Sequence, residues 1–428
     1  MPAWRRRCRR TTNHDPTAEC RPEALIAMDI MRKNVLLLSI SQALLVTSNS
    51  LLIASSALVG RQLAPYAELA TLPIAVQFGL TMLFSFPASL IMKRYGRRRG
   101  FITGGMAGLV GAATCSYAIL FGNFTFFVIG TGLIGIANGF AIFYRFAALD
   151  TATTGYQSRA IAYVLAGGVI AAFAGPNLAR FTQLAIESTP FAASYLSLIG
   201  VFAVSILVLS LLEIPPVREQ MYSQPVRPLF VIFRQPLFII ALLCGMLGYG
   251  VMSLIMNATP LAMRAAAFTF ADTTWVIQWH VVGMFAPSFV TGSLIDRYGL
   301  RNVLLTGALL NALAIGINLS GQEHNHFWLA LLSLGVGWNF LFIGATRLLA
   351  ETYNEAEKAR AQGLNDLLVF SVVSLTALAA APLHSHWGWQ AVNQLATLPL
   401  AIIFIAVAAL YLWSFKPVAT PATENEIP

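Results

Sequence analysis

The stretch SLIMKRYGRRRG (residues 89–100) returns in shortened form as GSLIDRYGLRN (residues 292–302). Both contain the core R-Y-G-x-R, and the two cores are 203 residues apart. Charged residues make up only 11% of the 428 residues, so two short segments this rich in charge stand out. A repeat at this distance divides the chain into two similar halves. The residue just before this core changes its charge between the copies, since Lys93 stands in the first and Asp296 in the second.

The composition favours a lipid environment for most of the chain. Hydrophobic residues make up 57% of it and the mean hydropathy is +0.69, which is more apolar than the surface of a water-soluble domain tolerates. Runs of roughly 18 or more apolar residues can cross a bilayer as helices. Twelve such runs start near Asn34, Glu68, Phe101, Phe124, Ala160, Thr189, Pro236, Thr273, Val303, His326, Gly363 and Ala391. Because the runs are continuous rather than alternating, they predict an all-α integral membrane protein with twelve transmembrane helices.

The basic residues predict the orientation of these helices. If both termini are cytoplasmic, all but three of the 27 Lys and Arg residues lie at cytoplasmic helix ends or loops, the exceptions being Arg61, Arg180 and Arg264. The positive-inside rule describes such a bias, so we expect a multi-pass protein of the cell (inner) membrane. The net charge of +9 reflects this topology and the lipid headgroups. Since the basic residues are spread over several loops between lipid-length runs, no nucleic-acid partner is expected.

A segment rich in proline and charge separates six of the runs from the other six. It reads EIPPVREQMYSQPVRPLFVIFRQ and covers residues 213–235. The expected units are a disordered basic cytoplasmic tail, an N-terminal six-helix bundle, a central cytoplasmic linker, a C-terminal six-helix bundle and a second cytoplasmic tail, over residues 1–33, 34–213, 214–235, 236–415 and 416–428.

The repeat and its loops resemble the major facilitator superfamily of secondary transporters. The loop motif of that family reads approximately G-x-L-a-D-R-x-G-R-r. The second copy matches it at Gly292, Leu294, Asp296, Arg297, Gly299 and Arg301. The first copy departs from it, with Ser89 in place of glycine and Lys93 in place of aspartate. The resemblance covers residues 34–415 and implies two pseudo-symmetric six-helix bundles, a transporter rather than an enzyme, and a monomer.

The resemblance implies a gating role for the charged loops. When two bundles rock about a central site, ion pairs between inner loops can hold the inner face shut. The expected gating residues of the first half are Arg94, Arg97, Arg98, Arg145, Asp150 and Arg159, and those of the second half are Asp296, Arg297, Arg301, Arg347, Glu351 and Arg360. Because Lys93 replaces the aspartate, the first loop cannot accept a bond from Arg145, and Asp150 would have to serve.

Polar side chains inside the predicted spans are candidates for substrate binding. Such side chains are costly in a membrane unless they face the bundle interior, and the family lines its cavity mainly with spans 1, 4, 7 and 10, surrounded by spans 2, 5, 8 and 11. The candidates are Gln42, Asn49, Gln77, Asn138, Tyr144, Tyr249, Asn257, Gln278, Trp279, His280, Trp338 and Asn339. Each could equally be a satisfied interhelical hydrogen bond or a packed aromatic ring.

The candidates favour a small neutral or weakly charged organic solute. No Asp, Glu, Lys or Arg lies at mid-membrane depth, so a fully ionised substrate would lack a counter-charge there. A molecule with aromatic faces and several hydrogen-bonding edges could stack on Trp279 or Trp338. An aromatic vitamin such as riboflavin, a nucleoside or an aromatic drug fits this description. Some bacterial members of the superfamily carry flavin vitamins, and the second half has a general likeness to that group.

Coupling and direction stay open at this point. Groups that could carry a coupling proton are His280, Asp366, Glu68 and Asp272, and uniport is the alternative. The fifth span contains GGVIAAFAGPN (residues 167–177), which resembles part of a glycine-proline motif of the exporter branch. Export of drugs or metabolites by proton antiport is therefore the alternative to import.

Other function classes find little support. A membrane enzyme would need a cluster of His, Cys or carboxylate groups at one face, and the nearest approaches are HSHWGW (residues 384–389) and EHNH (residues 323–326) on short outer loops. A channel would usually be oligomeric and lack such a repeat. There is no glycine-rich nucleotide loop, and the four cysteines have no metal-binding spacing, so no cofactor or metal is expected.

Overall fold

The computed structural model describes residues 22–152, 157–214, 227–354 and 356–412. Most of the two expected tails and of the expected linker lies outside these ranges. The regular structure of the described ranges is helical, without a strand. The elements are α2 (Pro22–Leu63), η1 (Ala67–Leu69), α3 (Leu72–Tyr95), α4 (Arg97–Leu120), α5 (Phe124–Ala141), α6 (Tyr144–Thr151), α7 (Gln157–Thr182), α8 (Ala192–Ser210), α9 (Leu229–Phe233), α10 (Pro236–Ala265), α11 (Phe270–Phe285), α12 (Ser288–Tyr298), α13 (Leu300–Ser320), α14 (His324–Ala350) and α15 (Lys358–Leu412).

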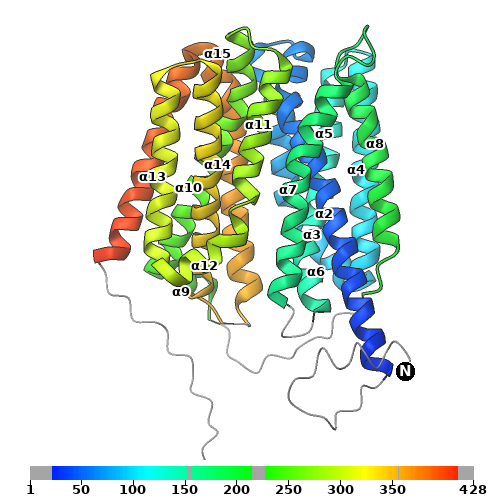
Figure 1. The fold of residues 1–428 in the computed structure, drawn as a ribbon, viewed down its shortest axis with the longest axis vertical. Coiled ribbons are helices and arrows are strands. Elements are labelled where there is room, and N and C mark those ends of the chain that lie inside the picture. Colours follow the sequence, from blue (N-terminus) through cyan, green and yellow to red (C-terminus); the bar gives the residue numbers. More distant parts are fainter. Residues whose placement is uncertain (1–21, 153–156, 215–226, 355, 413–428) are drawn as a thin grey trace, which may run out of the picture.

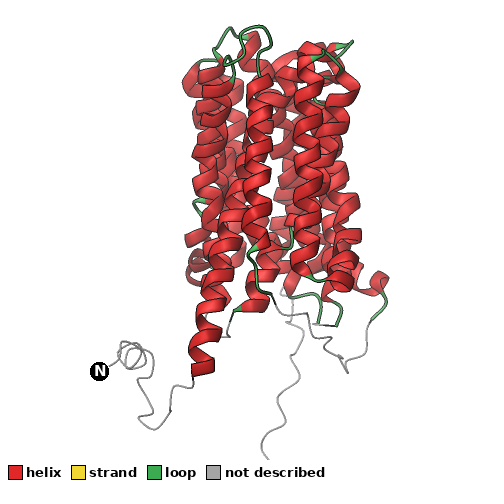
Figure 2. Cartoon of the chain, turned by 90° about the vertical axis from the view of Figure 1, so that its right-hand side faces the viewer, coloured by secondary structure: helices red, strands yellow, loops and turns green. Residues whose placement is uncertain are grey.

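The long helices stand roughly parallel (Figures 1 and 2). Figure 1 shows α2–α8 on one side of the molecule and α10–α15 on the other. Within the described ranges, nine helices are long and apolar enough to cross a membrane. α15 is in fact two helices, because Gly388 interrupts it with φ 77° and ψ −179°. With this division, and with α7 and the α11–α12 pair, the helices are consistent with twelve spans. The prediction of an all-α membrane protein is confirmed.

The first helix starts earlier than expected. α2 begins at Pro22, whereas the apolar run begins near Asn34, so residues 22–33 are helical rather than part of a disordered tail. Proline is well tolerated in the first turn of a helix, and the following EALIAM consists mainly of good helix formers. The sequence prediction missed this extension because it followed hydrophobicity alone.

The two R-Y-G-x-R loops adopt the same turn. Gly96 ends α3 with φ 88° and Gly299 ends α12 with φ 86°, a backbone conformation that favours glycine. Each glycine N–H donates to a carbonyl four residues earlier at 2.9 Å. In each copy the arginine also lies over the next tyrosine ring, at 5.2 Å for Arg94 and 5.3 Å for Arg297. We call the end of the molecule that carries these loops the basic face, and the other end the opposite face.

Two pairs of helices join the halves. α3 packs against α15, and α7 packs against α11. Ser374 Oγ donates to the carbonyl of Ala75 at 2.8 Å in the first pair, and Asn177 Nδ2 donates to Gln278 Oε1 at 2.8 Å in the second. A Cβ at Gly168 of α7 would lie 2.7 Å from the Phe285 ring of α11, so glycine is needed for this close approach. The contact between the halves is therefore built mainly by spans 2 and 11 and by spans 5 and 8.

Each end of the central segment is tied to its own half. At one end, Asn34 Nδ2 donates to the carbonyl of Glu213 at 2.8 Å, and Lys33 Nζ lies 2.5 Å from Glu213 Oε1. At the other end, Arg227 donates from Nε to Glu357 Oε1 and from Nη2 to Glu357 Oε2, both at 2.7 Å. The Glu357 side chain is fully buried, and the Arg227 contact lowers its pKa to about 2.

Replacing Glu357 with glutamine is expected to lower the stability of the C-terminal half by about 2 kcal/mol, because a buried charge-assisted pair is lost. The folded pKa lies below the ordinary value, so this stabilisation is complete above about pH 4.5 and is lost as the pH falls toward 2. Thermal unfolding of the purified protein in detergent, at pH 7 and at pH 3.5, measures it. The difference in Tm between wild type and variant should shrink at pH 3.5.

The matched control for that experiment is Glu323→Gln. Glu323 is exposed, and its side chain makes no capping bond at the start of α14. Its replacement should leave the Tm unchanged. An equal loss of Tm in both variants would contradict the stabilising role of Glu357.

Candidate functional site

Three of the predicted substrate-binding residues meet in the N-terminal half. Asn49 of α2 accepts hydrogen bonds at Oδ1 from Gln77 Nε2 of α3 at 2.9 Å and from Asn138 Nδ2 of α5 at 3.0 Å. Gln77 and Asn138 are buried, and Asn49 is half-buried. Gln77 Oε1 is buried without a hydrogen-bond partner, which leaves an acceptor for a further donor. We call these three side chains the amide triad.

If the amide triad binds the solute that the sequence analysis expects, replacing Asn49 with alanine should reduce the affinity about tenfold, because Gln77 and Asn138 lose the acceptor that fixes their orientation. The apparent KM of transport should rise, while the amount of protein in the membrane should change little. Asn325→Ala is the control, since Asn325 is exposed at the opposite face. An unchanged KM in the Asn49 variant would argue for a purely structural amide triad.

A group of aromatic rings lies in the C-terminal half. Tyr249 of α10 stands 5.1 Å from Trp338 and 5.8 Å from Phe342 of α14, and 5.9 Å from Phe370 of α15, measured between ring centroids. Trp338 and Phe342 stack with centroids 5.0 Å apart and planes 11° apart. Trp338 is 7% exposed, and its Nε1 is buried without an acceptor. This aromatic cluster therefore combines flat apolar faces with an unused donor.

Trp279 lies at the seam between the halves. Its ring is 6.4 Å from Phe173 of α7 in the first half and 6.4 Å from Trp328 of α14 in the second. The preceding residue, Gln278, accepts the hydrogen bond from Asn177 across the same seam. Both predicted residues thus lie at the α7–α11 contact, whose packing would change if the two halves moved relative to one another.

The remaining predicted residues are not brought together with these groups. Tyr144 packs edge-on against Phe101 at 4.8 Å within the N-terminal half. Asn257 donates to the carbonyl of Ser253 one turn earlier in the same helix, at 2.7 Å. Asn339 accepts from Thr291 Oγ1 at 2.7 Å and also donates to two groups of α11 and α12. Bonds of this kind favour a structural role.

Gln42 and His280 complete the predicted set. Gln42 is half-buried in α2, two turns before Asn49. His280 is fully buried, and its Nδ1 lies 2.7 Å from the carbonyl of Leu331, with Nε2 lacking a partner. Its ring is thereby packed between α11 and α14. No group of three or more potential metal ligands occurs among the described residues.

Arg145 of the first half faces a carboxylate of the second half. The charge of Arg145 interacts with that of Asp366 in α15. Among the described residues, however, Arg145 and Asp366 form no ion pair. Arg145 Nε is buried without a hydrogen-bond partner. The side chains of Asp150 and Arg159, expected to work with Arg145, lie outside the described set. Asp366 was considered above only as a proton carrier.

The other expected gating residues lie at or near the basic face. In the first half, Arg94 and Arg98 are exposed and Arg97 is half-buried. Those of the second half are all exposed, and no ion pair joins them with one another: Asp296, Arg297, Arg301, Arg347, Glu351 and Arg360.

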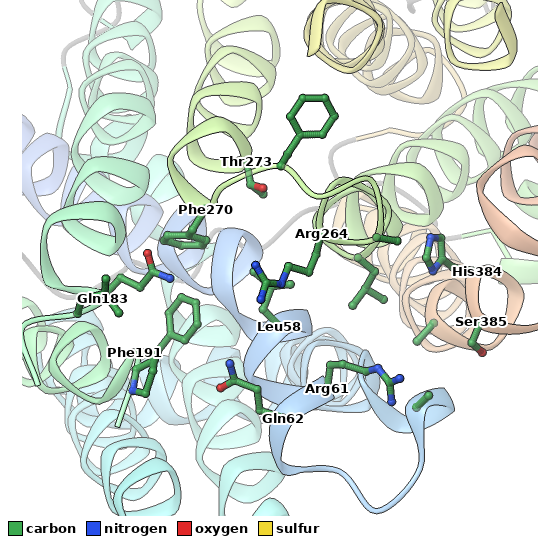
Figure 3. A pocket seen from close by; sticks show the side chains of 17 residues that line it. Leu58, Arg61, Gln62, Gln183, Phe191, Arg264, Phe270, Thr273, His384 and Ser385 are labelled. Atoms are coloured by element: carbon green, nitrogen blue, oxygen red, sulfur yellow. The ribbon is translucent and has the colours of Figure 1, made fainter. Parts of the chain in front are cut away.

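A cavity opens between the two halves at the opposite face. It has a volume of about 710 Å³, and none of the twelve predicted substrate residues lines it. Its lining combines Arg61 of α2 and Arg264 of α10 with Phe191, Phe270 and His384, and Figure 3 shows these side chains around it. We call this cavity the vestibule.

The floor of the vestibule is a small apolar cluster. Leu261 and Ala381, which line it, pack with Ala57 and Ala70, so α2, α10, α15 and the turn before α3 all contribute. All four residues are buried. The floor therefore closes the seam between the halves beneath the vestibule.

The sequence did contain a signal for the vestibule. Arg61 and Arg264 were noted as exceptions to the charge bias, and they are 203 residues apart, the same distance as separates the two R-Y-G-x-R cores. They are therefore equivalent positions of the repeat. The cavity itself could not be found this way, because the ends of five helices and two loops enclose it.

Comparisons with known proteins agree on one family. The model of the Major Facilitator Superfamily matches residues 38–261 and 241–427. The riboflavin transporter RfnT of Brucella anthropi is 36% identical over 377 residues, which cover 87% of this chain and 94% of that protein. The uncharacterized MFS-type transporter YdeG of Bacillus subtilis is 28% identical over 334 residues, covering 73% and 76%. The crystal structure of a D-xylose-proton symporter superposes with a TM-score of 0.67 at 13% identity, covering 90% and 98%, and is similar in fold alone.

Proposed function

The chain belongs to the major facilitator superfamily of membrane transporters, and from this premise we propose that it carries riboflavin across the cell inner membrane by alternating access. The observation that carries the proposal is the 36% identity to a riboflavin transporter over 94% of that protein's length. The chain is a transporter and not an enzyme. The substrate is the part that the proposal adds.

The chemistry of riboflavin suits the groups described above. Its ring system is flat and aromatic, and one edge alternates hydrogen-bond donors and acceptors like a pyrimidine. The aromatic cluster around Trp338 supplies flat faces, and the Trp338 N–H is an unused donor. The amide triad supplies an unused acceptor at Gln77 Oε1. Neither group carries a charge, which fits a neutral substrate.

The orientation follows from the distribution of charge. We place the basic face in the cytoplasm, together with both termini, because positively charged loops stay on that side. The opposite face, with the vestibule, is then the outer side. We take the working unit to be one chain surrounded by lipid, without a nucleic-acid partner.

Gating and coupling are assigned to charges near the basic face. The floor of the vestibule is packed, and in alternating access the basic face can then be open. An open basic face fits the exposure of the six expected gating residues of the second half, which form no ion pair with one another among the described residues. Arg145 and Asp366 lie within electrostatic reach of each other from opposite halves, so closing the basic face would pair them. Asp366 is also the carboxylate best placed for a coupling proton, since its charge partner belongs to the moving half.

The alternative of export rested on the glycines of the fifth span. A Cβ at Gly167 would lie 2.5 Å from the carbonyl oxygen of Ser39, and one at Gly175 would lie 2.6 Å from that of Thr47. Close packing of α7 on α2 is therefore sufficient reason for both glycines. These two glycines thus need no exporter role to explain them, and we propose import.

Uptake of labelled riboflavin by a bacterium that cannot synthesise it tests the proposal. Cells expressing the chain should accumulate the label and grow at lower external riboflavin than cells with an empty vector. A protonophore should abolish accumulation above the external concentration if a proton is coupled, and leave equilibration intact in uniport. Expression at the membrane without any gain in uptake would contradict the proposal.

A further inference from the structure

The vestibule has a charge of one sign. Arg61, Arg264 and His384 are among the seventeen residues that line it, and no aspartate or glutamate is among them. Two acids near the lining residues in sequence have partners: Glu68 pairs with His386 at 3.3 Å, and Asp272 accepts bonds from Thr269 at the start of α11. A third, Glu187, is exposed on the loop between α7 and α8 and does not line the cavity. Arg61 and Arg264 are both exposed, so their guanidinium groups can reach a dissolved molecule. A cavity with cations on its walls and no lining acid concentrates anions.

The two arginines come from opposite halves. Arg61 ends α2 and Arg264 lies in the last turn of α10, at equivalent positions of the repeat. Figure 3 shows both side chains between the Phe191–Phe270 ring pair on one side and His384 on the other. Both guanidinium groups line the same cavity, one from each half, so a phosphate or carboxylate that enters it meets positive charge on both walls and can accept hydrogen bonds from a guanidinium group.

The vestibule also has aromatic walls. Phe191 of the first half and Phe270 of the second are buried, and their ring centroids lie 4.9 Å apart at 86°. Phe268 extends the same apolar side. Ring edges and faces of this kind hold flat aromatic molecules. The volume of about 710 Å³ lies within the range of roughly 300–1,000 Å³ that is typical of small-molecule sites.

An anion held here has no onward path through the described groups. The floor of Ala57, Ala70, Leu261 and Ala381 is apolar, so it offers an ionised group no partner. Farther along the spans, the amide triad and the aromatic cluster contain no basic side chain, and Arg145, which is half-buried, is close to the basic face. Moving an ionised group past this region without a counter-charge is costly.

We propose that the vestibule is a binding site for an aromatic molecule carrying a phosphate or carboxylate, and that it retains this anion without transporting it. The site uses Arg61 and Arg264 for the anion and the Phe191–Phe270 pair for the ring. This further consequence rests on the proposed function: a phosphorylated flavin bound in the vestibule should inhibit riboflavin uptake from outside. The vestibule would then separate neutral flavins, which pass, from anionic flavins, which stay at the entrance.

Direct binding to the purified protein in detergent tests the site by itself. Three probes separate the contributions of charge and ring: inorganic phosphate, riboflavin and flavin mononucleotide. Flavin mononucleotide should bind wild type, and the Arg61→Gln/Arg264→Gln variant should bind it at least about tenfold more weakly. The control is Arg180→Gln, because Arg180 is an exposed arginine at the same face outside the vestibule lining. Equal affinity in wild type and the double variant overturns the proposal, as does inorganic phosphate competing as well as the flavin phosphate.

Uptake experiments distinguish a failure of the vestibule site from a failure of the proposed function. In cells, flavin mononucleotide should inhibit riboflavin uptake by wild type and by Arg180→Gln, and the inhibition should be lost in the double variant while uptake without inhibitor persists. Thermal unfolding of the double variant should match wild type, which shows that the fold is intact. If riboflavin is not transported but flavin mononucleotide binding still depends on the two arginines, the vestibule site stands and the proposed function fails. Accumulation of flavin mononucleotide itself inside the cells overturns the retention.

Discussion

Replacing Trp338 with alanine is expected to lower riboflavin uptake at least about thirtyfold. Trp338 stacks on Phe342 and meets Tyr249 at 5.1 Å, so its loss removes the central ring of the aromatic cluster. A thirtyfold loss of affinity corresponds to about 2 kcal/mol, which is within the range for removing an aromatic anchor from a binding site. The measurement is initial uptake rate against riboflavin concentration, normalised to the amount of protein in the membrane.

Two further variants separate binding from folding. Trp338→Phe keeps a ring but removes the buried N–H, which has no acceptor in the structure. If riboflavin accepts this bond, affinity should fall about threefold to tenfold while the Tm stays close to wild type. Trp387→Ala is the control, because Trp387 is 66% exposed at the opposite face. Full uptake by the Trp338→Ala variant at normal abundance would remove the aromatic cluster from the substrate site.

Neutralising either member of the Arg145–Asp366 pair is expected to reduce uptake about a hundredfold. Arg145 belongs to α6 in the first half and Asp366 to α15 in the second, and the charge of each acts on the other. In the closed state, in which the two would pair, removing one partner leaves the other charge uncompensated, and a hundredfold loss of uptake corresponds to about 2.7 kcal/mol. The expected variants are Arg145→Gln and Asp366→Asn, each assayed for uptake and for abundance in the membrane.

Exchanging the two charges provides the decisive control. The Arg145→Asp/Asp366→Arg protein restores the attraction in the reverse sense, so its uptake should exceed that of either single variant. A double variant no better than the single ones would mean that the charges act independently. Normal uptake in Arg145→Gln would contradict a gating role for the pair.

The halves and their charged loops could be predicted from the sequence because both leave local signals. Gly96 and Gly299 repeat the same turn since each stands after R-Y in an otherwise helical stretch. The long apolar runs mark the helices, although Gly388, which separates the last two, looks like an ordinary loop residue in the sequence. Hydrophobicity also missed the start of α2 at Pro22, because residues 22–33 form a helix without a long apolar run.

The site could be predicted only in part, because side-chain partners depend on how helices are rotated. Asn49, Gln77 and Asn138 lie on different helices and meet as an amide triad. Asn339 has the same residue type but satisfies all its bonds against α11 and α12. Composition cannot distinguish these outcomes. Arg145 and Asp366 were missed as a pair since they belong to different spans and occupy non-equivalent positions of the repeat.

Riboflavin counterflow in proteoliposomes shows directly whether the chain carries riboflavin. Purified protein is reconstituted into vesicles loaded with unlabelled riboflavin, and labelled riboflavin is added outside. We expect the label to accumulate transiently without any energy source. This accumulation should be lost in the Trp338→Ala variant and absent when the vesicles are loaded with xylose in place of unlabelled riboflavin. Properly folded protein that exchanges another solute but not riboflavin would contradict the assigned substrate, and with it the central claim.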